Sequence, residues 1–265
     1  MKYSFVSFSC PDADLSTLLA MASEFGYDGA EIRSGAGHRH GIELGLSPEA
    51  IADIRQRFAA SGVFPICLSV SCHYSDSATL ASNLEETRSY LRLAGALGFP
   101  LLRVFCGVLP EGSDRSRVRE QIAASLSELA PLAAESNVVL AVETHDDWSD
   151  PREMASVLSA VNHPAVGVVW DVMHTLRGGK TSMEEAYRIL KPWLRHVHIH
   201  DGLLDPSRLA FRPIGQGEID HRPVVRLLAN DRYEGFLSGE WLDWEDPEVH
   251  LPRELSAMRQ YEREL

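Results

Sequence analysis

The sequence predicts a single-domain α/β protein in which eight strand–helix units close into a (β/α)8 TIM barrel. Short apolar runs alternate with amphipathic stretches along the whole chain, a pattern typical of parallel strands joined by right-handed crossovers. The 265 residues are close to the roughly 250 that such a barrel usually has. No G-x-G-x-x-G or P-loop motif follows an early strand, which argues against the alternative, an open doubly wound sheet.

The strand-like runs are short and rich in Val, Ile, Leu and Phe, as expected for parallel strands that are buried on both faces. No linker-like change of composition interrupts the alternation, so we expect one domain over residues 1–265. The runs are YSFVSFS from Tyr3, GAEIR from Gly29, PICLSVSC from Pro65, LLRVFCG from Leu101, VVLAVETH from Val138, VGVVWD from Val166, RHVHIHD from Arg195 and FLSGEW from Phe236.

Capping residues mark the helices between these runs. Gly26 and Gly98 follow helical patterns and are expected to end those helices, because glycine readily adopts the left-handed conformation found there. Ser47 and Asp150, each followed by proline, are expected to begin helices. Ser182 has a glutamate three residues later, which predicts a capping box at the start of a further helix.

Composition and charge exclude several function classes. The formal net charge of −13 disfavours binding to nucleic-acid phosphates or anionic membranes. The four cysteines form no C-x-x-C pair and are expected to be reduced thiols. The N-terminal apolar stretch is too short for a signal peptide, and no stretch approaches the length of a membrane span. We therefore expect a cytoplasmic protein.

Polar residues follow several of the strand-like runs, where the active site of such a barrel lies. Glu143, Asp171 and Glu240 end three of these runs, and the run between the last two carries histidines at 196, 198 and 200 on one face. Any one of these residues alone would more often be a helix cap or a hydrogen-bonded core residue. A parallel strand buried on both faces does not readily accommodate inward charges, so four such strands in a row predict a metal site.

The ligand chemistry indicates which ion such a site prefers. Three carboxylates and one imidazole suit a divalent ion with oxygen-rich coordination, such as Mg²⁺ or Mn²⁺. The imidazole shifts the preference toward Mn²⁺ or Co²⁺, whereas structural Zn²⁺ sites are richer in Cys and His. We expect one ion per chain, most simply Mn²⁺, with Mg²⁺, Co²⁺ or Zn²⁺ as alternatives.

Several motifs resemble those of a known superfamily. VETH, VVWDVMH, RHVHIHDG, PIGQGEID and SGEW, in this order, are similar to motifs of the xylose isomerase-like barrels, and the resemblance covers nearly the whole chain. That superfamily includes ketose 3-epimerases, inosose dehydratases, hydroxypyruvate isomerases and endonuclease IV. The resemblance implies that the metal ligands are Glu143, Asp171, His198 and Glu240.

The resemblance also implies a chemistry and a substrate class. Such isomerases and epimerases move a proton next to a carbonyl of a small sugar-like substrate through an enediolate. Glu143 and Glu240 would carry the proton as well as bind the metal. His145 and His174 would bind substrate hydroxyls, and Glu31, with Arg33 on the same strand face, could close the pocket; a layer residue or barrel salt bridge is the alternative for this pair.

The chain departs from the family pattern in the run after the ligand histidine. His200 replaces a lysine that many members have, and Leu204 stands where ketose epimerases often carry an arginine. Arg208 could substitute for that arginine from the same loop, as could Arg212. Three tryptophans just past strand ends could form an apolar wall for a sugar ring, with ordinary packing as the alternative for each: Trp148, Trp241 and Trp244.

Three other functions compete with an isomerase or epimerase. The first is a metal-dependent lyase that dehydrates a keto-inositol or related keto-sugar on the same scaffold. The second is a nuclease for abasic DNA, disfavoured by the acidic charge and by Cys106, which stands where a histidine ligand would be needed. The third is a non-enzymatic binding module, disfavoured because four buried ligands are costly without a metal. A homo-oligomer is possible.

Overall fold

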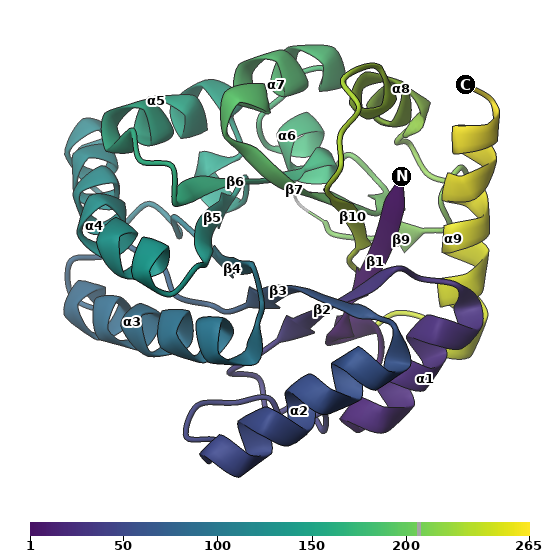
Figure 1. Cartoon of the computed structure of the whole chain (residues 1–265). Helices are drawn as coiled ribbons and strands as arrows, with labels where there is room; N and C mark the ends of the chain where they lie inside the picture. Colours follow the sequence, from purple (N-terminus) through teal and green to yellow (C-terminus); the bar gives the residue numbers. More distant parts are fainter. Residues whose placement is uncertain (206–207) are drawn as a thin grey trace.

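The eight apolar runs all form strands in the computed structural model, which describes residues 1–205 and 208–265. Neighbouring strands pair in parallel, and β1 pairs with both β2 and β10, so the sheet closes into a barrel in the order β1-β10-β7-β6-β5-β4-β3-β2 (Figure 1). The prediction of a (β/α)8 barrel is therefore confirmed. Its strands are β1 Lys2–Val6, β2 Gly29–Arg33, β3 Phe64–Ser69, β4 Leu101–Val104, β5 Val139–Glu143, β6 Val166–Asp171, β7 Leu194–Ile199 and β10 Phe236–Gly239.

Helices surround the barrel (Figure 1), and their ends follow the capping residues in the sequence. Gly26 ends α1 with φ +86°, and the side chains of Ser47, Asp150 and Ser182 accept hydrogen bonds from the first turns of α2, α5 and α7. The helices are α1 Leu15–Phe25, α2 Pro48–Ser61, α3 Leu80–Leu97, α4 Arg115–Glu135, α5 Pro151–Val161, α6 Val172–Arg177, α7 Met183–Leu190, α8 Arg222–Asn230 and α9 Pro247–Arg263, with short 3₁₀ turns η1 Ser7–Ser9, η2 Asp146–Trp148 and η3 Lys191–Trp193. No helix among the described residues has the length and apolar character needed to cross a membrane.

The PIGQGEID motif folds back on the end of β7 and is held by Asp201. Its carboxylate accepts hydrogen bonds from the backbone N–H groups of Gly215, Gly217 and Ile219 at 2.9–3.0 Å. A side chain at Gly217 would collide with that carboxylate. The motif therefore shapes the loop that follows β7, which also contains the antiparallel pair β8 (Asp201–Gly202) and β9 (Phe211–Arg212).

A small apolar cluster lies at the amino ends of the strands, separate from the main core between strands and helices. Its members are Ile66 and Cys67 on β3 and Leu101, Val139 and Phe236 at the starts of β4, β5 and β10. Burying such side chains is favourable by about 25 cal/mol per Å² of apolar surface. The barrel is thus filled with hydrocarbon at this end, which leaves the polar residues to the opposite end.

Candidate active site

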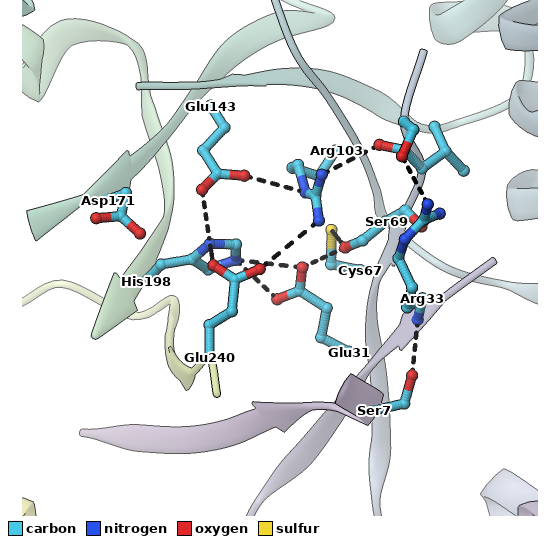
Figure 2. A network of polar contacts seen from close by, with 12 residues as sticks. Ser7, Glu31, Arg33, Cys67, Ser69, Arg103, Glu143, Asp171, His198 and Glu240 are labelled. Carbon is cyan, nitrogen blue, oxygen red and sulfur yellow. Dashed lines mark hydrogen bonds and ion pairs between the residues drawn. The ribbon is translucent and has the colours of Figure 1, made fainter. Parts of the chain in front are cut away.

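The four sequence-predicted ligands come together at the carboxyl ends of their strands (Figure 2). Strand register sets their level, because Asp171 pairs with His198 across β6 and β7, and His198 pairs with Ser238, two residues before Glu240. One ligand atom from each of Glu143, Asp171, His198 and Glu240 lies within 4.8 Å of every other. The first three are at most 1% exposed. This cluster could hold a divalent ion.

The hydrogen bonds of His198 orient its ring toward that point. Its Nε2 lies 3.1 Å from Glu31, and its Nδ1 lies 3.3 Å from Glu143 and 3.2 Å from Glu240. A neutral imidazole carries one proton, so an Nε2–H that donates to Glu31 leaves the Nδ1 lone pair facing two carboxylates. That arrangement is repulsive unless a cation lies between the lone pair and the carboxylates, as it would in a metal site with a carboxylate supporting the histidine.

Burial and charge act in opposite directions on the pKa values in this cluster. Burial raises the pKa of Glu31, but His198 and His196 lower it well below its usual value. Burial lowers the pKa of His198, yet Glu31, Glu240 and Glu143 raise it well above the ordinary range. For Glu240, burial is outweighed by His198 and Arg103, and the pKa is about 2. Without a metal, the site therefore attracts a proton to His198.

Arg103 is the functional residue that the sequence reasoning missed. It points into the barrel from β4, is 1% exposed, and its Nε lies 3.1 Å from Glu143 Oε2 in an ion pair whose geometry is not that of a hydrogen bond. Its Nη2 lies 3.8 Å from Glu240, so it stands beside both glutamates (Figure 2). The signal was a lone arginine in the apolar run LLRVFCG, since a buried strand rarely carries an unpaired charge.

The donor set and its unsatisfied atoms fit a divalent cation. Glu143 Oε2 and Asp171 Oδ2 are buried carboxylate oxygens without a hydrogen-bond donor. Asp171 Oδ1 caps α6 through the backbone N–H of His174 at 2.7 Å, which fixes the carboxylate, and its Oδ2 lies 3.0 Å from His200 Nε2. Carboxylate oxygens and one imidazole nitrogen are ligands that hard and borderline divalent ions accept.

A cavity of about 250 Å³ opens beside this cluster at the same end of the barrel. His145, His174 and His200 line one part of it, with Arg33, Arg103 and Glu240 on another. The rings of His145 and His174 are 4.1 Å apart, and His145 pairs with Asp146 at 2.9 Å. Burial opposes protonation of His145, but Asp146 and Glu143 raise its pKa to about 9. The cavity thus offers both proton donors and carboxylate acceptors.

Two residues predicted to bind substrate lie elsewhere. Glu31 is fully buried and bonded to Ser69, His196 and His198, which matches the alternative role of a layer residue, whereas Arg33 on the same strand does line the cavity. Arg208 is exposed, and its neighbour Leu209 lines the cavity instead. The side chains of Glu31 and Arg208 therefore do not meet the histidines at the described cavity.

The apolar wall also differs from expectation. Trp148 and Trp241 are at most 1% exposed and belong to the core. Among the described residues that line the cavity, phenylalanines and histidines supply the aromatic rings and no tryptophan is present. Trp148 and Trp241 therefore have the alternative role of ordinary packing, and Trp244 packs behind Phe211, with ring centroids 6.0 Å apart. Large indoles just past the strand ends pack inward under the loops, where more apolar surface can be buried. The lining phenylalanines are Phe8, Phe105 and Phe211.

Comparison with known proteins identifies the family. Residues 19–261 match the model of the xylose isomerase-like TIM barrel, so the chain belongs to that family. It is 27% identical over 178 residues to a putative hydroxypyruvate isomerase of Mus musculus, covering 62% of this chain and 60% of that protein. It is 27% identical over 164 residues to an inosose dehydratase of Clostridium botulinum (strain Alaska E43 / Type E3), covering 54% and 53%. The chain thus spans between about half and two thirds of these relatives' length.

Among solved structures, the chain resembles 3-keto-D-glucoside 4-epimerase from E. coli, with a TM-score of 0.81, 16% sequence identity, and coverage of 98% of this chain and 99% of the other. At that identity, the likeness speaks for the fold. The resemblance found in the sequence motifs is therefore confirmed at the level of family and fold, and the relatives are sugar isomerases, epimerases and dehydratases.

Proposed function

We propose that the protein is a divalent-metal-dependent isomerase or epimerase that moves a proton next to the carbonyl of a keto-sugar. The observation that carries this proposal is the convergence of Glu143, Asp171, His198 and Glu240 within 4.8 Å, beside a cavity lined by histidines and arginines. Mn²⁺ suits this donor set best. A bound ion would polarise the substrate's carbonyl and hydroxyl oxygens and stabilise the negative charge that develops there.

The two glutamates have complementary positions for proton transfer. Glu143 and Glu240 approach His198 from different sides of the barrel opening (Figure 2). The pKa of Glu240 is lowered to about 2 against the effect of burial, which keeps its carboxylate ionised at neutral pH. One glutamate takes the proton from the carbon next to the carbonyl, and the other returns a proton from the opposite face, which inverts that carbon.

The remaining cavity residues orient the substrate. Arg103 beside both glutamates, with Arg33 at the rim, would donate hydrogen bonds to substrate oxygens and offset the excess of carboxylate charge. His174, whose pKa burial lowers, would meet a hydroxyl as a neutral imidazole. The phenylalanines of the lining would pack against the C–H face of the sugar and exclude water.

A dehydratase is the second candidate, and His145 is the observation that favours it. With a pKa raised to about 9 against burial by Asp146 and Glu143, His145 is protonated at neutral pH and faces the cavity. A glutamate would remove the proton next to the carbonyl, a double bond would form, and the neighbouring hydroxyl would leave as water with the proton of His145. The inosose dehydratase relative is in keeping with this alternative.

Proton exchange in D₂O tests the proposal. The Mn²⁺-loaded protein is incubated with keto-hexoses, keto-pentoses and inososes, and ¹H NMR follows the carbon next to the carbonyl. We expect deuterium incorporation without loss of water for an isomerase or epimerase, and a new unsaturated product for a dehydratase. Asp171→Asn should abolish either reaction, whereas Asp53→Asn on the exposed face of α2 should change nothing. Exchange that persists in Asp171→Asn or in excess chelator would refute metal-dependent catalysis.

A further inference from the structure

A second cavity adjoins the candidate active site and is not used by the mechanism above. It measures about 380 Å³, larger than the 250 Å³ of the catalytic cavity. Phe105 lines both, and Asp146, which lines the second, is paired at 2.9 Å with His145, which lines the first. The two cavities are therefore neighbours across one phenyl ring and one His–Asp pair, at the carboxyl ends of β3, β4 and β5.

Hydrogen bonds between loops give the second cavity a fixed shape. The backbone N–H groups of Tyr74 and Ser75 both donate to the Cys106 carbonyl at 3.0 and 2.9 Å. The Ser75 hydroxyl donates to the Val108 carbonyl at 2.7 Å. Gly107 has φ +97°, and a side chain there would lie 2.7 Å from Ser75 Oγ, so the loops can approach this closely only with glycine. These contacts between the loops after β3 and β4 therefore fix the shape of the cavity.

Three of the residues that line this cavity accept hydrogen bonds. Asp76 and Asp146 provide carboxylates. His73 donates from Nδ1 to the Ser71 carbonyl at 3.0 Å, which leaves Nε2 as an acceptor in the neutral ring. Such a wall suits the hydroxyl groups of a ligand and repels phosphate or carboxylate.

Other residues that line the cavity are apolar. Phe105, Val108 and Pro110 line it, and Val108 is 64% exposed although it stands next to a buried glycine. An exposed aliphatic side chain at the mouth of a cavity gains stability when a ligand covers it. A ring with hydroxyls on its edge and C–H groups on its face can contact both kinds of lining residue, and a second sugar ring has that form.

We propose that this second cavity binds a further sugar ring of the substrate, so that the enzyme acts on keto-sugars that carry a glycosidic substituent rather than on free or phosphorylated monosaccharides. The inference rests on the proposed function for the site of the reaction, and it adds the class of substrate. The reacting keto-sugar occupies the catalytic cavity, and its glycosidic oxygen passes Phe105 to the second ring.

A pair of substrates tests the proposal. Deuterium exchange is measured with the Mn²⁺-loaded protein on 3-keto-cellobiose and on 3-keto-glucose, and binding of each is measured by calorimetry. We expect KM for the disaccharide to be roughly tenfold lower, a difference that corresponds to about 1.4 kcal/mol of binding. Val108→Trp, which fills the cavity, should raise KM for the disaccharide by a similar factor and leave kcat, metal content and the monosaccharide unchanged.

Val249→Trp is the matched control, because Val249 is 57% exposed on α9, away from the cavity; it should leave both substrates unaffected. Asp76→Asn should weaken disaccharide binding alone.

Equal KM values for the two substrates, with Val108→Trp without effect, would overturn the second sugar site and leave the proposed reaction standing. Absence of exchange on both substrates, with disaccharide binding still sensitive to Val108→Trp, would overturn the proposed reaction and leave the second site standing. Absence of both exchange and binding would overturn both.

Discussion

At the amino end of the barrel, Ile66, Leu101 and Phe236 fill the interior with hydrocarbon, whereas at the carboxyl end the same strands or their neighbours direct Glu143 and Arg103 inward. The apolar end lowers the free energy of folding through burial. The charged end loses hydration when the chain folds, and the attraction within buried ion pairs rarely exceeds that lost hydration free energy. Such a region persists when its charges serve a ligand or a reaction, so the two ends are expected to respond differently to mutation.

The largest effects should come from two variants at the charged end. Glu240→Ala should lower turnover at the upper end of the roughly 10²–10⁴-fold range of acid–base catalysis and weaken Mn²⁺ binding, because one side chain serves both purposes. His174→Ala should also lower turnover but keep the metal, because His174 lines the cavity and is not one of the four proposed ligands. Measuring the metal content and kcat of the two variants tests both expectations. Loss of metal in His174→Ala with retention in Glu240→Ala would contradict the assignment of ligands.

The apolar end should show the opposite behaviour. Ile66→Ala removes a side chain that is 2% exposed and should lower the free energy of unfolding by about 2–5 kcal/mol, with Mn²⁺ affinity unchanged in the folded protein. Phe64→Ala on the same strand is the control, because Phe64 is 60% exposed and its loss should cost little. Denaturant unfolding and metal titration measure both quantities. A loss of metal affinity in folded Ile66→Ala would show that the two ends are coupled.

Glu31 lies between the apolar end and the charged end of the barrel, so its substitution tests where the influence of the charged end stops. It accepts hydrogen bonds from His196, His198 and Ser69, so Glu31→Gln should loosen the orientation of His198 and reduce Mn²⁺ affinity by about 10–100-fold, as is usual for a carboxylate behind a metal-binding histidine. Glu254→Gln is the control, since Glu254 is equally buried but bonds to Ile214 and Arg253. Mn²⁺ titration by calorimetry compares them, and equal affinities would contradict the positioning role.

The smallest effect concerns a loop that supports the charged end. His40 donates from Nε2 to the Arg33 carbonyl and accepts at Nδ1 from the Ile42 N–H, so the folded protein requires it neutral. Burial lowers its pKa from 6.5 to about 4. Because the unfolded chain then takes up a proton that the folded chain does not, stability is lost as pH falls from 7 toward 4.

From that pKa shift, His40 contributes about 2 kcal/mol to the decrease in the free energy of unfolding between pH 7 and pH 5. His40→Asn should be less stable at pH 7 but should lose correspondingly less on acidification. Urea unfolding at both pH values measures the difference. Parallel pH dependences in the two proteins would rule out His40 as the source.

The sequence was sufficient for the fold and for the convergence of polar strand-end residues on one rim, because both follow from local patterns. Strands buried on both faces appear as apolar runs, and capping residues such as Asp150 mark helix starts through their own hydrogen bonds. A barrel brings all strand ends to one rim, so residues that end runs, such as Glu143 and Asp171, could be placed together without coordinates.

The tertiary structure was needed to show which side chains face one another inside the barrel. Arg103 and Glu31 stand on strands whose order is known from the sequence, but each has partners both on the adjacent strand and across the barrel. Register and side-chain rotamers fix which of these groups meet. The sequence also left open where Trp148 and Arg208 lie, the first buried in the core and the second exposed. A loop can turn its side chain into the core or into solvent, and competition for buried apolar surface among several loops determines which.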